Sequence, residues 1–202
     1  MGSKNGKGPN AAEAAAMLFA GNRRYVAGEA AHANQSGERR AEVAGGQSPF
    51  AIVLGCSDSR VPPEIIFDTG LGDLFVIRVA GNIIDDAVLG SIEYAAVHLG
   101  TPLVVALGHA SCGAVTAAVS GGDAEGHLPC VLSAIRPAVE KAEHRPGDVT
   151  EHAIRANAKL AAEQMTKRST VLARLVRARK LHIIAAYYDL ATGRVEELAS
   201  ES

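Results

Sequence analysis

Three residues of the types that bind transition metals come directly after two apolar runs of the chain. Cys56 stands in Gly-Cys-Ser-Asp-Ser-Arg, and His109 and Cys112 stand in Gly-His-Ala-Ser-Cys-Gly. Two thiolates and one imidazole suit Zn²⁺, and three protein ligands leave the fourth tetrahedral position open for water, as in catalytic zinc sites. We therefore predict that Cys56, His109 and Cys112 bind a catalytic Zn²⁺.

The chain has one further cysteine and six further histidines that could compete for this assignment. Cys130 follows Pro129, and we interpret it as a packed or half-exposed thiol because a free cysteine behaves as a small hydrophobe. The other histidines show no ligand spacing, so each is interpreted as a surface or packing residue. Which of them relays protons is left open, as is the role of Cys130.

The ligands are positioned by short, β-branched apolar runs that read as buried strands. Such runs span residues 50–55, 74–79 and 103–108, and they suit a parallel sheet covered on both faces. Residues 85–99 carry apolar residues at helical spacing between the second and third runs, which makes a βαβ unit. Ligands of open parallel sheets gather at the carboxyl ends of the strands, so the two ligand loops are expected to face each other.

The remaining segments complete an α/β fold with a mostly parallel central sheet. We predict four parallel strands plus an antiparallel edge strand, flanked by helices, with an N-terminal helical arm at 11–48. Residues 1–10 are expected to be disordered and 11–202 to form one domain. The other expected elements are helices at 11–26, 112–119, 128–142, 149–164 and 169–178 and strands at 181–188 and 194–198, joined by a turn at 189–193.

Composition narrows the class of partner. The 202 residues are 48% hydrophobic, with a formal net charge of −2 and interspersed charges, which does not suggest a nucleic-acid or membrane partner. No signal peptide or membrane-spanning run is apparent. Three cysteines are an odd and sparse set, which favours free thiols in a reducing compartment. We expect a cytoplasmic protein that acts on a small molecule.

The ligand motifs together resemble one family. Cys-x-Asp-Ser-Arg followed by His-x-x-Cys-Gly is the signature of β-carbonic anhydrases, and residues 61–62, 72–75, 78–82 and 91–95 also resemble that family. The resemblance implies zinc-dependent, reversible hydration of CO₂ to bicarbonate and a proton by attack of zinc-bound hydroxide. Because two thiolates cancel the charge of the metal, the bound water should be only moderately acidic, and activity should rise above pH 7.

Asp58 and Arg60 lie beside the first ligand. Asp58 is close enough to Cys56 either to ligate zinc or to accept a hydrogen bond from the bound water, and Arg60 matches its carboxylate as a fork. The resemblance implies that this dyad keeps the carboxylate off the metal and orients the hydroxide. The plain alternative is an ion pair at a strand end, which would contribute little stability.

Three more residues are assigned by the resemblance alone. Gln47 matches the donor glutamine of the plant-type branch, and Phe75 and Tyr94 match its pocket aromatics, which come from the neighbouring subunit. This implies substrate-binding roles and a homodimer or higher homo-oligomer. Without the resemblance, Gln47 would be interpreted as a solvated loop residue and the two aromatics as residues of the hydrophobic core. The other branch has a tryptophan where Val53 stands, and the chain has no Trp, so bicarbonate gating is not expected although Arg78 is present.

Alternatives to CO₂ hydration start from the same residues. A thiolate phosphatase is disfavoured because Cys56 and Arg60 are separated by three residues rather than five and Asp58 would repel a phosphate. A carbonyl sulfide or carbon disulfide hydrolase on the same zinc scaffold is the main alternative. A zinc-stapled dimerisation module without catalysis is the non-enzymatic alternative.

Overall fold

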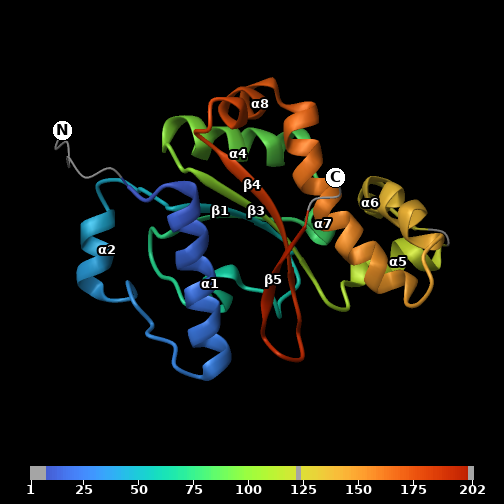
Figure 1. The fold of residues 1–202 in the computed structure, drawn as a ribbon, viewed down its shortest axis with the longest axis horizontal. Helices are drawn as coiled ribbons and strands as arrows, with labels where there is room; N and C mark the ends of the chain where they lie inside the picture. Colours follow the sequence, from blue (N-terminus) through green and yellow to red (C-terminus); the bar gives the residue numbers. More distant parts are fainter. Residues whose placement is uncertain (1–7, 122–123, 200–202) are drawn as a thin grey trace.

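A five-stranded sheet forms the centre of the protein, as the sequence predicts (Figure 1). The computed structural model describes residues 8–121 and 124–199. The strand order is β2-β1-β3-β4-β5, with the first four strands parallel and β5 antiparallel to β4. The strands are β1 (Ala51–Gly55), β2 (Leu74–Arg78), β3 (Leu103–His109), β4 (His182–Tyr188) and β5 (Val195–Leu198). The predicted fold class is confirmed.

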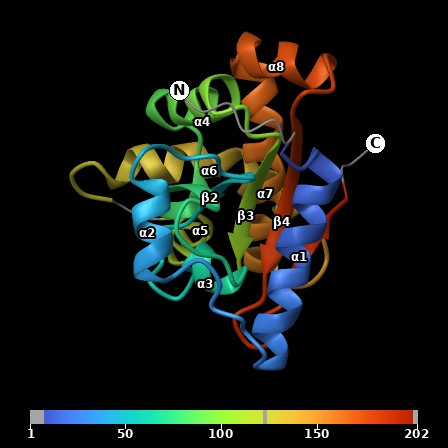
Figure 2. The same cartoon turned by 90° about the vertical axis from the view of Figure 1, so that its left-hand side faces the viewer.

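Helices cover both faces of the sheet because the central strands are apolar on both sides. Every residue of β1 and β3 is buried. Alternate residues point in opposite directions along a strand, so Ile52 and Leu54 face one helical layer and Ala51 and Val53 the other. The first layer is α4 (Asp86–His98), α7 (Val149–Arg168) and α8 (Thr170–Arg177), and the second is α1 (Ala11–Ala27) and α3 (Pro63–Ile66), as Figure 2 shows.

Strand β2 lies on one side of β1 in the sheet and β3 lies on the other, so the strand order reverses at β1. The space outside the carboxyl ends of β1 and β3 is therefore the topological switch point of the sheet. Gly55 pairs with Leu107 in the parallel register. The residues that follow these two positions therefore emerge at the same edge. The 3-10 turn η1 (Ala80–Asn82), α5 (Gly113–Ser120) and α6 (Leu128–Glu143) gather beside this edge and bury its loops.

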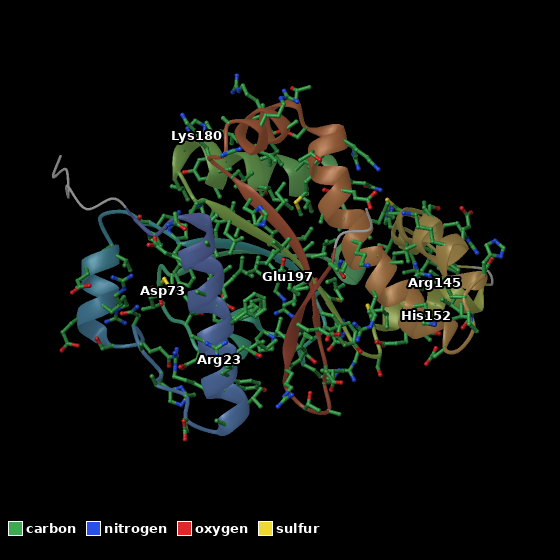
Figure 3. All side chains as sticks on the ribbon, in the orientation of Figure 1. Arg23, Asp73, Arg145, His152, Lys180 and Glu197 are labelled. Carbon is green, nitrogen blue, oxygen red and sulfur yellow. The ribbon has the colours of Figure 1, made fainter. Side chains whose placement is uncertain are left out.

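The N-terminal arm is held to the body by polar contacts. Asn10 caps α1 and forms a capping box with Glu13, so the disorder predicted for residues 1–10 does not extend to Asn10. Residues 1–7 lie outside the described residues. Asn34 and Arg39 both bind the Asp73 carboxylate ahead of β2, and Figure 3 shows Asp73 beside the arm.

Several boundaries differ from the predictions for local reasons. Only α2 (Gly37–Val43) is helical between 29 and 48. The four-residue α3 is too short to show a period, and proline occupies its first turn. The helix predicted to end at residue 164 continues to Arg168, and Ser169 then caps α8 through a bond from the Leu172 N–H. Within the described residues, no helix combines the length and apolar character needed to cross a membrane.

Candidate metal centre

The structure brings the three predicted ligands together at the switch point. The ligand atoms of Cys56, His109 and Cys112 all lie within 4.8 Å of one another. The Cys56 and Cys112 sulfurs are 4.0 Å apart, and the three residues are 5%, 0% and 1% exposed. A thiolate–imidazole–thiolate set at this spacing has the donor atoms and the size of a tetrahedral transition-metal site.

The loop after β3 fixes the histidine ring. His109 is the last residue of β3, and Ser111 adopts a left-handed conformation (φ 51°) that turns the chain into α5, where Cys112 is the N-cap residue. The His109 Nδ1 donates to the Ala110 carbonyl at 2.9 Å, since a carbonyl can only accept. The Nε2 atom is therefore left as an acceptor, and it is buried without a hydrogen-bond partner among the described residues. A metal ion supplies the partner that this nitrogen lacks, so the residues fit the group.

The two thiols act as one titrating pair. The hydrogen bond with Cys112 lowers the pKa of Cys56 despite its burial, and the same bond together with burial raises the pKa of Cys112. Cys56 thus loses its proton more readily than Cys112, whose thiol keeps its proton. Metal binding requires thiolates and would displace this proton.

Asp58 and Arg60 form the predicted pair beside the triad. Arg60 donates from Nε to Oδ1 at 2.9 Å and from Nη2 to Oδ2 at 2.8 Å. A further bond joins Arg60 Nη2 to the Ser111 carbonyl at 3.2 Å. These bonds from Arg60 are the main reason that the pKa of Asp58 lies well below its usual range. The Asp58 Oδ2 lies 4.0 Å from His109 Nε2, so the carboxylate borders the centre while its fork partner holds it.

Arg78 has a contact that the sequence does not reveal. Its Nε donates to the Cys56 carbonyl at 2.9 Å and its Nη2 to the Asp58 carbonyl at 2.5 Å. Arg78 therefore clamps the backbone of the loop that carries both a ligand and the acidic residue. In the sequence, Arg78 was considered only in connection with bicarbonate gating, although its position at the end of β2, beside Gly55, could have indicated this contact.

A buried asparagine on α7 also reaches the metal centre indirectly. The Asn157 Nδ2 donates to the Gly81 carbonyl at 2.7 Å, and the Gly81 N–H donates to the Cys56 sulfur at 3.3 Å. Asn157 is not among the residues predicted from the sequence. The available signal was its place three residues after Ile154 on the apolar face of a predicted helix.

The residues assigned to substrate binding are not brought to the triad within one chain. Gln47 is exposed and makes no hydrogen bond with the described residues. The Phe75 and Tyr94 rings contact each other with centroids 6.2 Å apart. Phe75 pairs with Ile52 in the sheet, four residues before Cys56, which is roughly 13 Å along the strand. Tyr94 is 48% exposed, and its ring also contacts His98 at 5.3 Å.

The structure is that of an α/β protein with a buried group of three residues that could hold a metal ion. A family model described as carbonic anhydrase matches residues 51–195. A carbonic anhydrase from Mycolicibacterium smegmatis is 46% identical over 198 residues, which cover 93% of this chain and 94% of that protein.

Solved structures agree with this match. The β-carbonic anhydrase CafA of Aspergillus fumigatus superposes with a TM-score of 0.74 at 29% identity, over 93% of this chain and 92% of that one. A β-carbonic anhydrase of Sordaria macrospora, described as tetrameric, gives a TM-score of 0.73 at 28% identity, over 80% and 86% of the two chains. The chain belongs to the carbonic anhydrase family, in its β class, and is an enzyme of that family.

Proposed function

We propose that this chain catalyses the reversible hydration of CO₂ to bicarbonate and a proton, with Zn²⁺ held by Cys56, His109 and Cys112. The observation that carries the proposal is the buried triad whose His109 Nε2 finds no hydrogen-bond partner in residues 8–121 and 124–199. When bound, Zn²⁺ lowers the pKa of a coordinated water and so supplies a nucleophile near neutral pH.

Asp58 and Arg60 are proposed to orient the nucleophile. The Arg60 fork occupies one acceptor site on each carboxylate oxygen, and a carboxylate oxygen can accept a second bond. The free site on Oδ2 can therefore accept a hydrogen bond from a donor at the centre. The lowered pKa of Asp58 keeps its carboxylate ionised, and so an acceptor, throughout the neutral range. Arg78 holds the same loop through its hydrogen bond to the Cys56 carbonyl.

The apolar part of the CO₂ pocket is proposed to come from a second copy of the chain. Phe75 and Tyr94 stand on the open edge of the sheet and on the neighbouring helix, away from their own triad. We propose a homodimer or higher homo-oligomer in which these rings and Gln47 complete each other's sites, in keeping with the plant-type pattern and with the tetrameric relative. A single domain over 11–202 and a cytoplasmic location, suited to the three free cysteines, complete the proposal.

The reaction is tested by metal analysis together with stopped-flow CO₂ hydration. We expect about one zinc per chain, a rate that rises between pH 7 and 9, and hydration far faster than hydrolysis of carbonyl sulfide. The Asp58→Ala variant should retain zinc and lose most of the rate. A zinc-replete sample without hydration activity would contradict the proposal, and dominant carbonyl sulfide hydrolysis would favour the alternative on the same scaffold.

The shared pocket is tested by mixing two impaired variants. Asp58→Ala spoils its own site but still offers Tyr94 to a partner, whereas Tyr94→Ala spoils only the site of its partner. Random exchange of subunits should restore ~one quarter of wild-type activity, since half of the dimers then carry one intact site. Mixtures that stay at the level of the separate variants would place Tyr94 in its own site or outside the pocket.

A further inference from the structure

The backbone turn η1 delivers an N–H group to the sulfur of one metal ligand. Gly81 and Asn82 both have left-handed backbones, with φ of 67° and 42°. This conformation directs the Gly81 N–H to the Cys56 Sγ at 3.3 Å. Left-handed residues in succession are costly for side chains other than glycine, so the turn depends on its surroundings to keep this shape.

Packing leaves the turn little freedom to move. A Cβ atom added to Gly81 would lie 2.7 Å from the Ile135 Cδ1 and 3.2 Å from the Ala114 Cβ. Helices α5 and α6 therefore contact the turn directly, and a side chain at this position would require the end of Ile135 to move. The carbonyl of Gly81 faces a third helix, α7, where it accepts the 2.7 Å hydrogen bond from Asn157 Nδ2.

Asn157 is a poor choice for its position unless this bond matters. The residue is 3% exposed in the interior of α7 and lies on the same buried face as Ala153, Ile154, Ala158 and Ala161. Asparagine has a low helix propensity, and burying an amide is unfavourable unless the amide is hydrogen-bonded. An apolar residue would suit the helix better, and what Asn157 adds is a donor aimed at one carbonyl.

We propose that Asn157 is a positioning residue of the metal centre, which acts through the Gly81 peptide to hold an N–H group on the Cys56 sulfur. The inference rests on the proposed function in that the triad binds Zn²⁺. A hydrogen bond to a thiolate withdraws negative charge from the sulfur. A bound metal would then receive less charge from Cys56 and stay a stronger Lewis acid, and a sulfur held in one position would favour metal binding over a sulfur free to move.

The test compares Asn157→Ala with a matched control, Asn22→Ala. Asn22 is also a buried asparagine whose Nδ2 donates to backbone carbonyls, at 3.1 Å to Ile66 and 2.9 Å to Gly193, and it touches neither the turn nor a ligand. Competition with a chromophoric chelator measures zinc affinity. We expect Asn157→Ala to bind zinc about 10-fold to 100-fold more weakly, the usual effect of removing a residue that supports a ligand, and Asn22→Ala to bind as wild type.

Cobalt substitution gives a readout that general loss of stability does not move. Without the N–H bond the sulfur lone pairs rise in energy, so the thiolate-to-cobalt charge-transfer band should shift to longer wavelength in Asn157→Ala only. The pH profile of kcat/KM should also shift to higher pH. If Asn157→Ala does not fold, Asn157→Ser, which retains a shorter donor, should show the same changes at smaller size.

The outcomes separate this inference from the proposed function. Asn157 variants with the zinc affinity, cobalt band and pH profile of Asn22→Ala would overturn the positioning role while wild type still binds zinc and hydrates CO₂. Wild-type protein that fails to bind zinc would instead contradict the proposed function itself.

Discussion

Two aspartates ten residues apart hold similar ion pairs at opposite ends of the same connection. Asp58 pairs with Arg60 at 2.8 Å beside the triad. Asp68 pairs with Arg24 of α1 at 2.6 Å and also accepts the N–H groups of Ala31 at 2.9 Å and His32 at 3.0 Å. The pKa of each carboxyl is lowered, by Arg60 at Asp58 and, against the opposing effect of burial, by the N–H groups and the guanidinium at Asp68.

The difference lies in what each pair connects. Asp58 and its partner are two residues apart and Arg60 is 53% exposed, so the ion pair itself joins no distant elements, although Arg60 also reaches the loop after β3 at the Ser111 carbonyl. The Asp68 side chain is 1% exposed and joins α1 and the arm to the end of α3. The same chemical group should therefore serve the reaction at Asp58 and the fold at Asp68.

The largest expected effect is loss of the metal, because Asp58 then has no reaction to serve. His109→Ala should bind zinc too weakly to purify with it and should lose at least about 10³-fold in kcat/KM, since a metal Lewis acid contributes several kcal/mol. Metal content and stopped-flow rates measure this. In the His109→Ala background, Asp58→Asn should then change neither rate nor stability. A further rate loss would show that Asp58 acts independently of the metal.

Asp58→Asn in the intact enzyme is the next largest effect. The amide keeps the shape but loses the charge and one acceptor oxygen, so kcat/KM should fall by about 10²-fold, the scale of a misplaced reacting group. Zinc content should remain that of wild type, and urea unfolding should change by less than about 1 kcal/mol. Loss of zinc from this variant would instead make Asp58 part of the binding site.

Asp68→Asn should show the opposite pattern. We expect the free energy of unfolding to fall by about 2 kcal/mol, the scale of hydrogen bonds to a charged group, with kcat/KM within about twofold of wild type. Because Arg24 is 41% exposed, the backbone N–H bonds should account for most of the loss. Urea unfolding and hydration assays on one preparation test this. A large rate loss with unchanged stability would remove the distinction between the two pairs.

The smallest expected effect is the pH dependence of the difference in free energy of unfolding between wild type and Asp68→Asn. A carboxyl whose folded pKa is lowered stabilises fully above its unfolded pKa, near 3.9, and loses this contribution as pH falls through the folded value. The difference between wild type and Asp68→Asn should thus be constant from pH 7 to about 5 and shrink below about 4. Zinc-free protein is used, so that metal release does not contribute. A difference that grows in acid would contradict the assigned sign.

The sheet and the ligand triad could be predicted because both depend on local patterns. Short apolar runs define β1 and β3, and parallel order places residues after them at one edge, which brings Cys56 and His109 together across the intervening chain. Asp58 and Arg60 could be predicted as well, because they are close in sequence to Cys56. These features need no knowledge of side-chain packing.

Contacts between distant elements could not be read in this way. Nothing near Asn157 in the sequence indicates a carbonyl 76 residues away, and the link from Asp68 to Arg24 spans 44 residues. The left-handed turn at Gly81 and Asn82 is fixed by packing against three helices rather than by its own residues. Roles that require a second chain, as proposed for Phe75 and Tyr94, depend on contacts outside a single fold.

The two edges of the sheet have different consequences for a chain on its own. Strand β5 carries Glu196 and Glu197, of which Figure 3 labels Glu197, and their charges discourage the addition of further strands. Strand β2 is Leu-Phe-Val-Ile-Arg, and no backbone hydrogen bond from residues 8–121 or 124–199 reaches its outer side. An isolated chain would thus offer an apolar template for strand addition, and dilution or mutations that separate the subunits should produce aggregation rather than a well-behaved monomer.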